Sequence, residues 1–171
     1  MAGRQSDLFG TLASRSGKPE PKAEPGPEPA GIDEVVINAD GGSRGNPGPA
    51  GIGAVVALPN GTVLAEIAEG IGHTTNNVAE YKAVIAGLER AHELGARRVK
   101  VRADSKLVIE QLKGTWKVRQ PHLVPLRDAA KQAARRFERV SYEHVRREYN
   151  KAADALANQA MDTQAALRRG R

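Results

Sequence analysis

The chain has 171 residues, 40% of them hydrophobic, which suits one domain with terminal tails. It contains no cysteine, which excludes disulfides and thiolate metal sites and suits a reducing compartment, so we expect a cytoplasmic protein. The net charge of +6 favours a polyanionic partner, nucleic acid first, and without a long apolar run or a secretory signal we expect no membrane association.

Residues 1–31 are predicted to be a disordered tail and linker. Prolines alternate there with Glu, Lys, Ala and Gly between Pro19 and Pro29. Such a segment cannot bury enough apolar surface to offset the entropy lost on ordering. We therefore expect the folded, catalytic domain over residues 32–165 and a short basic C-terminal tail over residues 166–171.

The first predicted strand, residues 34–39, is apolar and rich in β-branched side chains, which is typical of a buried strand. It ends on Asp40, and a turn rich in Gly and Pro follows. An isolated Asp-Gly pair is more often a turn or capping feature. The carboxylates found later in the chain favour a functional role here.

Two further strands, residues 51–58 and 62–71, are separated by the hairpin signal P-N-G and predict an antiparallel meander with the first. A helix is predicted over residues 77–94, with Glu80 in its first turn. The remaining elements are a strand, two helices, a strand and a last helix, over residues 97–103, 106–112, 121–137, 140–145 and 150–167. This order predicts an α/β domain with a five-stranded mixed sheet flanked by helices.

Four carboxylates stand out in this layout: Asp40, Glu80, Asp104 and Asp154. Two of them end strands predicted to be parallel, and two lie near helix N-termini, so they can meet beyond the carboxyl ends of the strands. Four like charges are costly together unless cations neutralise them, and oxygen ligands favour Mg²⁺, with Mn²⁺ as a substitute. Two such ions support in-line phosphodiester cleavage. Taken singly, each acid has an ordinary reading as a helix-terminal or solvated charge.

Four motifs, in this order, resemble those of type 1 ribonuclease H. They are D-G-G-S-R-G-N-P-G-P-A-G from Asp40, T-N-N-V-A-E ending at Glu80, the pair Asp104-Ser105, and N-K-A-A-D-A-L-A around Asp154. The resemblance covers about residues 33–162. It implies the family's five-stranded mixed sheet and endonucleolytic hydrolysis of the RNA strand of an RNA–DNA hybrid by two metal ions, leaving 5′-phosphate and 3′-hydroxyl ends.

The resemblance also implies catalytic roles. Asp40 would contact both metal ions, Asp154 would join it at the ion that activates water, and Glu80 and Asp104 would complete the other site. The chain between the last strand and the last helix is too short for the mobile loop that carries a catalytic His in many members. Arg147 resembles the substitute found in a shorter-loop branch of the family, whereas His144 is expected to be structural.

Substrate contacts are implied as well. Asn46, Asn76 and Asn77 match positions that read RNA 2′-hydroxyls, and Thr75 matches one that holds a DNA phosphate. Trp116 either lies beside the DNA strand or covers the core, two readings of equal weight. The full set of expected contacts is Gly41, Ser43, Asn46, Thr75, Asn76, Asn77, Lys106, Trp116 and Lys117, where each lysine is either a phosphate contact or part of a solvated face.

Several alternatives stay open. The basic protrusion of many family members is absent, because only residues 117–120 separate Trp116 from the next helix. A non-catalytic hybrid-binding module is expected to have lost a carboxylate, and integrases or transposases of the same superfold usually lack the T-N-N-x-x-E feature. A nuclease that also cuts double-stranded RNA remains an alternative, as do primer removal during DNA replication, R-loop clearance and ribonucleotide repair. We expect a monomer.

The N-terminal tail contains one further motif, Q-S-D-L-F, formed by Gln5, Leu8 and Phe9 with two intervening residues. It resembles the Q-x-x-L-F pentapeptide by which bacterial replication and repair proteins bind the sliding clamp. A long linker would then raise the effective concentration of the catalytic domain at its partner. Short motifs match by chance, so an inert tail is an equal alternative.

Overall fold

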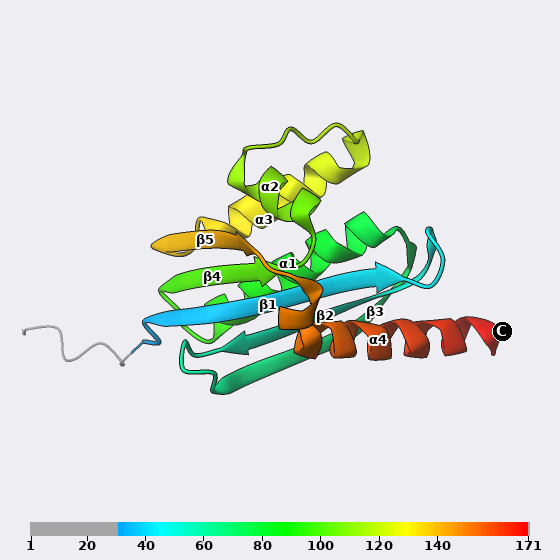
Figure 1. The fold of residues 1–171 in the computed structure, drawn as a ribbon, viewed down its shortest axis with the longest axis horizontal. Coiled ribbons are helices and arrows are strands. Elements are labelled where there is room, and N and C mark those ends of the chain that lie inside the picture. Colours follow the sequence, from blue (N-terminus) through cyan, green and yellow to red (C-terminus); the bar gives the residue numbers. More distant parts are fainter. Residues whose placement is uncertain (1–30, 171) are drawn as a thin grey trace, which may run out of the picture. The chain divides into compact units, whose positions relative to one another are not determined.

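The computed structural model describes residues 31–170, so the Q-S-D-L-F motif lies outside the described residues. The elements follow the predicted order (Figure 1). They are β1 (Glu34–Ser43), β2 (Gly48–Ala57), β3 (Val63–Thr74), α1 (Asn76–Glu93), β4 (Arg98–Ala103), α2 (Lys106–Lys113), the 3₁₀ turn η1 (Pro121–Leu123), α3 (Val124–Ala134), β5 (Arg139–His144), the 3₁₀ turn η2 (Arg147–Tyr149) and α4 (Lys151–Arg169).

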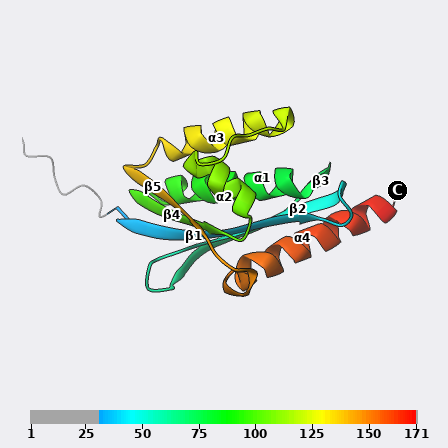
Figure 2. The same ribbon diagram turned by 45° about the horizontal axis from the view of Figure 1, so that its top comes forward.

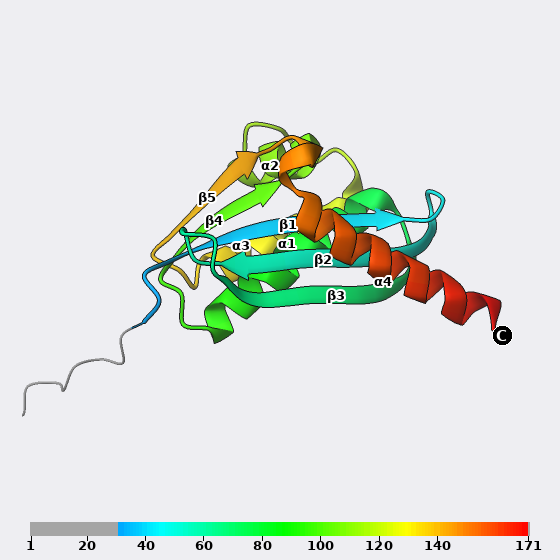
Figure 3. The same cartoon turned by 60° about the horizontal axis from the view of Figure 1, so that its bottom comes forward.

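The predicted mixed sheet is confirmed. Its strand order is β3-β2-β1-β4-β5, with antiparallel β1–β2 and β2–β3 pairs and parallel β1–β4 and β4–β5 pairs. Helices α1, α2 and α3 cover one face, and α4 lies on the other (Figure 2). Figure 3 shows α4 running across β1, β2 and β3, which are the strands it packs against.

The main core lies between the sheet and helices α1–α3. Val35 and Ile37 of β1 and Val99 and Val101 of β4 are buried at alternating positions, as the two-residue period of a strand requires. They pack in one cluster with the inward faces of the three helices, including Leu88. Each such side chain contributes roughly 1.5–3 kcal/mol on burial, so this packing stabilises the sheet against its three helices.

Several predicted boundaries are wrong. The first strand does not end at Asp40 but continues to Ser43, because the Gly-rich segment pairs with β2 down to Ala50. The third helix is shorter than predicted, and Phe137 is buried although it lies beyond the helix end. Helix α4 runs to Arg169, so most of the predicted basic tail is helical. Within residues 31–170, no helix has the length and apolarity that a bilayer-spanning segment needs.

Candidate active site

Three carboxylates from separate elements meet at one edge of the sheet. Asp40 lies in β1, Glu80 in α1 and Asp104 directly after β4. One carboxylate oxygen from each residue lies within 4.8 Å of those from the other two. Asp154, near the start of α4, lines the same cavity and lies beside Asp40. The structure therefore brings together all four acids that the sequence singled out.

The pairing of β1 and β4 explains part of this convergence. Ala39 and Ala103 form the last parallel pair, so Asp40 and Asp104 are the next residues of two neighbouring strands. Gly41 brings in the third acid, because a Cβ at that position would lie 2.3 Å from the carbonyl carbon of Ala79. Only glycine allows β1 to approach the start of α1 this closely, and Glu80 follows Ala79 directly.

Asn150 positions the fourth acid. Its buried side chain donates through Nδ2 to the carbonyl oxygen of Ala39 (2.9 Å) and accepts from Nδ2 of Asn38 (3.1 Å). These bonds hold the start of α4 against the end of β1, next to Asp40. This role of Asn150 was not predicted, although Asn150 belongs to the motif that contains Asp154.

A second glycine lets α4 lie close to the sheet. A Cβ on Gly53 of β2 would lie 2.3 Å from the carbonyl oxygen of Ala153. Because Gly53 is the β2 partner of Asp40, this contact brings the first turns of α4 directly under the acid cluster. Any larger side chain at this position would push Asp154 away from Asp40.

The cluster carries strong mutual repulsion. Burial, followed by the charge of Asp104, raises the pKa of Asp40 from 3.8 to about 8, and Asp154 and Glu80 add to the shift. Burial also raises the pKa of Glu80 to about 7, against the opposing effect of a hydrogen bond from Ser105. Buried oxygen ligands that hold protons in the absence of cations are a donor set that fits a hard divalent cation such as Mg²⁺ or Mn²⁺.

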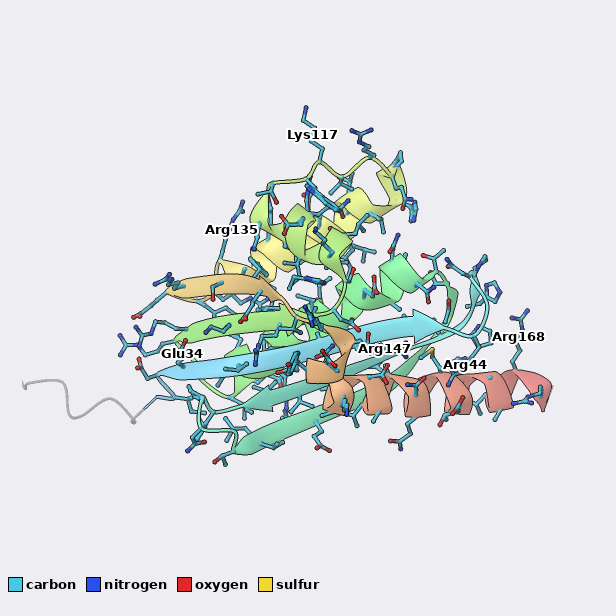
Figure 4. All side chains as sticks on the ribbon, viewed as in Figure 1. Glu34, Arg44, Lys117, Arg135, Arg147 and Arg168 are labelled. Atoms are coloured by element: carbon cyan, nitrogen blue, oxygen red, sulfur yellow. The ribbon has the colours of Figure 1, made fainter. Side chains whose placement is uncertain are left out.

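Arg147 of η2 lines this cavity beside the start of α4. Its Nη2 lies 3.2 Å from Oδ1 of Asp154, and its side chain remains 76% exposed. Figure 4 shows Arg147 beside β1. His144 ends β5, and its Nε2 lies 3.2 Å from the backbone carbonyl oxygen of Asp104. Both side chains therefore adjoin the acid cluster, but only Arg147 contacts a carboxylate of it.

The β1–β2 hairpin and the start of α1 form a polar wall beside the acids. Oδ1 of Asn76 accepts from the backbone N–H and the hydroxyl of Ser43 (2.8 and 3.1 Å), and Oδ1 of Asn46 accepts from the backbone N–H of Asn76 (3.2 Å). Because the oxygens are bound within the protein, the amide groups of Asn46 and Asn76 are left with their N–H donors. Thr75 caps α1 through its hydroxyl, and Asn77 is half-buried in the same turn.

Arg44 and Asn158 also line the cavity, and neither was predicted. The guanidinium of Arg44 donates to Oδ1 of Asp162 (2.8 and 3.0 Å) and to Oδ1 of Asn158 (3.1 Å), which ties the β1–β2 turn to α4. The spacing of Asp154, Asn158 and Asp162 is four residues, so they share one face of the helix. That spacing was the available sequence signal.

The remaining predicted contacts form a separate group around α2 and the loop after it. Trp116 is 45% exposed, so its reading as a cover of the core is wrong. Nζ of Lys106 lies 5.8 Å from the centre of its ring. Lys117 projects outward from the same loop (Figure 4). Trp116 and Lys117 line a groove of their own, distinct from the cavity of the acids.

Comparison with known proteins identifies relatives. A family described as reverse transcriptase-like matches residues 38–160. A bifunctional protein of Mycobacterium tuberculosis is 56% identical over 133 residues, which cover 77% of this chain and 36% of that protein. The chain thus spans about a third of this relative's length. A ribonuclease H of Phenylobacterium zucineum is 35% identical, with 79% of this chain and 95% of that protein covered.

Solved structures of ribonuclease H proteins have the same fold as this chain. The N-terminal RNase H domain of the M. tuberculosis protein superposes with a TM-score of 0.77 at 56% identity, covering 78% of this chain and 97% of that chain. An RNase H1 isolated from compost, solved with an RNA/DNA hybrid, gives a TM-score of 0.73 at 41% identity, covering 75% and 97%. With these matches over the region that carries all four motifs, the chain belongs to the ribonuclease H family.

Proposed function

We propose that the protein is a metal-dependent endonuclease that hydrolyses the RNA strand of RNA–DNA hybrids. The observation that carries this proposal is the convergence of Asp40, Glu80 and Asp104 within 4.8 Å, with Asp154 beside them. A non-catalytic binding module has no need for such a repulsive cluster. The relative solved with an RNA/DNA hybrid supports the substrate class.

The four carboxylates would hold two Mg²⁺ ions, or Mn²⁺ in their place, and the ions would activate the attacking water and stabilise the leaving oxygen. The protonation of the carboxylates affects how they bind the ions. Asp40 and Glu80 hold protons readily in the free protein, so cation binding requires them to release protons. Asn150 and Gly41 hold the helices that carry Asp154 and Glu80 close to Asp40, which limits the reorganisation of the site when substrate binds.

Arg147 adds a positive charge at the edge of the acid cluster, 3.2 Å from Asp154. A guanidinium there would stabilise negative charge that develops on the scissile phosphate. Its exposure leaves it free to exchange Asp154 for the substrate. In this proposal Arg147 takes the place of the His loop that the chain is too short to form.

The polar wall supports recognition of RNA. Within residues 31–170 the side-chain N–H groups of Asn46 and Asn76 donate no hydrogen bond, and a ribose 2′-hydroxyl can accept from them. Asn77, Ser43 and Gly41 belong to the same surface, and Thr75 would contact a DNA phosphate. Trp116 and Lys117 of the second groove, with Lys106 beside the Trp116 ring, would contact the DNA strand, since an exposed aromatic beside lysines is suited to a nucleic-acid backbone.

The proposal includes 5′-phosphate and 3′-hydroxyl products, a monomeric state and a cytoplasmic location, which the cysteine-free composition supports. Recruitment to a sliding clamp through Gln5, Leu8 and Phe9 is part of it, as is a task in DNA replication or repair.

The test is a panel of three labelled duplexes: RNA–DNA hybrid, double-stranded RNA and double-stranded DNA, each with Mg²⁺, Mn²⁺ or EDTA. We expect the RNA strand of the hybrid to be cut with either ion and no duplex to be cut in EDTA. Cleavage of double-stranded RNA at a comparable rate would support the broader nuclease. Binding of the hybrid without any cleavage would support the non-catalytic module.

A further inference from the structure

Tyr149 is an exposed aromatic residue two positions after Arg147, which lines the acid cavity. It ends η2, and its side chain is 66% exposed. Among residues 31–170 it has no side-chain hydrogen bond or ring contact. Single exposed apolar side chains are common on protein surfaces, but Tyr149 is distinguished by its neighbours in the chain.

The backbone of η2 is fixed at both ends against the proposed catalytic site. Two residues before Tyr149, Arg147 contacts Asp154, and directly after it the buried Asn150 bonds to Ala39 beside Asp40. The turn is closed by hydrogen bonds from the N–H of Tyr149 to the Arg146 carbonyl oxygen and from the N–H of Asn150 to that of Arg147, both 2.9 Å.

Chain geometry limits the distance from this ring to the acids. Consecutive Cα atoms are about 3.8 Å apart, and Tyr149 directly precedes Asn150 and lies two residues after Arg147, both of which contact the acid site. A nucleic-acid strand in a duplex advances about 3.4 Å per nucleotide. Tyr149 can therefore reach a nucleotide a few positions away from a phosphate at the acid cluster.

Two exposed cations are near neighbours of Tyr149 in the chain, Arg146 three residues before it and Lys151 two residues after it. The side chain of Arg146 is 82% exposed, and the carboxylate it approaches, that of Glu148, is 3.8 Å away. Lys151, at the start of α4, is also exposed. An aromatic face between basic side chains is the combination by which proteins bind unpaired nucleotides, since base–aromatic stacking contributes about 1–3 kcal/mol per base. Bases inside a duplex have no free face to stack on, so the fitting occupant is an unpaired base.

We infer that Tyr149 stacks on an unpaired ribonucleotide of the RNA strand where the hybrid passes into single-stranded RNA. Arg146 and Lys151 contact the phosphates on either side of that nucleotide. The protein accordingly prefers hybrids that carry a single-stranded RNA extension to blunt hybrids of the same sequence. This inference rests on the proposed function and adds a substrate preference to it.

The experiment measures binding and cleavage separately. Fluorescence anisotropy in EDTA at low salt gives the Kd for a blunt hybrid and for the same hybrid with four unpaired ribonucleotides at the 3′ or the 5′ end of the RNA. The proteins are the wild type, Tyr149→Ala, Tyr149→Phe and, as a matched control at an exposed apolar position, Leu167→Ala. Cleavage of the blunt hybrid in Mg²⁺ is measured in parallel.

For the wild type we expect one of the extended hybrids to bind about 5- to 100-fold more tightly than the blunt one. Tyr149→Ala should lose this preference and keep its affinity for the blunt hybrid, while Tyr149→Phe and Leu167→Ala retain both. The inference is overturned if Tyr149→Ala retains the preference, or if a wild type that cleaves the blunt hybrid shows none. A wild type that neither binds nor cleaves any hybrid overturns the proposed function and this inference with it.

Discussion

Replacing Asp40 with Asn separates the role of this residue in catalysis from its effect on folding. Asn is close to Asp in size, so the variant should keep the fold. It removes a buried negative charge that faces Glu80, Asp104 and Asp154. We expect hybrid cleavage to fall below detection, and the metal-free protein to become more stable at neutral and alkaline pH.

The size of the stability change follows from the pKa of Asp40. In the folded protein it is raised from 3.8 to about 8, so the folded state keeps a proton that the unfolded state loses. The wild type is therefore progressively destabilised as the pH rises from about 4 to about 8, and no further above it. One pKa unit corresponds to about 1.4 kcal/mol, which sets an upper bound of roughly 5–6 kcal/mol. Because the four acids titrate together and the site can relax, we expect about half of this.

Thermal unfolding in EDTA between pH 4 and pH 9 measures the effect. A gain of roughly 3 kcal/mol raises Tm by about 6–12 °C in a domain of this size. The Tm difference between Asp40→Asn and the wild type should therefore grow from near zero at pH 4 to that value at pH 8. Added Mg²⁺ should stabilise the wild type and reduce the difference. A difference that stays flat across this pH range, or a variant less stable at pH 8, would refute the reasoning.

Three further predictions concern other parts of the molecule. Arg147→Ala should lower the cleavage rate at saturating Mg²⁺ while His144→Ala changes it less, and a larger loss in the histidine variant in steady-state assays would show that the cation is misassigned. Asn150→Ala should lower the free energy of unfolding in urea by about 1–3 kcal/mol, because the carbonyl oxygen of Ala39 loses a buried donor. The same variant should need a higher Mg²⁺ concentration for half-maximal cleavage, and an unchanged Mg²⁺ requirement would contradict the positioning role of Asn150. A peptide of residues 1–12 should bind the sliding clamp of the source organism with micromolar Kd in calorimetry, and Leu8→Ala with Phe9→Ala should abolish this binding; equal binding by both peptides would exclude the motif.

Sequence patterns predicted the fold and the acid cluster because both depend on local signals. Apolar alternation located the strands, and a carboxylate at or just after each of two parallel strands implied a shared edge. Asp40 illustrates the limit of this reasoning. It lies inside β1, and its position at the end of a strand holds only for the pairing with β4, which stops at Ala39. Strand pairing is a property of two segments, so one segment cannot reveal it.

The supporting residues were not predictable in the same way. Asn150 acts through a hydrogen bond to a residue 111 positions earlier in the chain. Gly41 and Gly53 act by what they lack, since a Cβ at either would overlap the backbone of a packed helix. Trp116 had two readings of equal weight, and its exposure in the folded chain argues only against the reading as a cover of the core. In each case the information lies in tertiary contacts.

The central claim is that the four converging carboxylates make this protein a metal-dependent nuclease for RNA–DNA hybrids. Its most direct test is the rate of cleavage of a 5′-labelled RNA strand in a hybrid, measured in Mg²⁺ for the wild type and for folded Asp40→Asn. We predict that the wild type cuts the RNA strand and that Asp40→Asn leaves it intact. An intact RNA strand after incubation with folded wild type in Mg²⁺ and in Mn²⁺, or equal cleavage by Asp40→Asn, would contradict the claim.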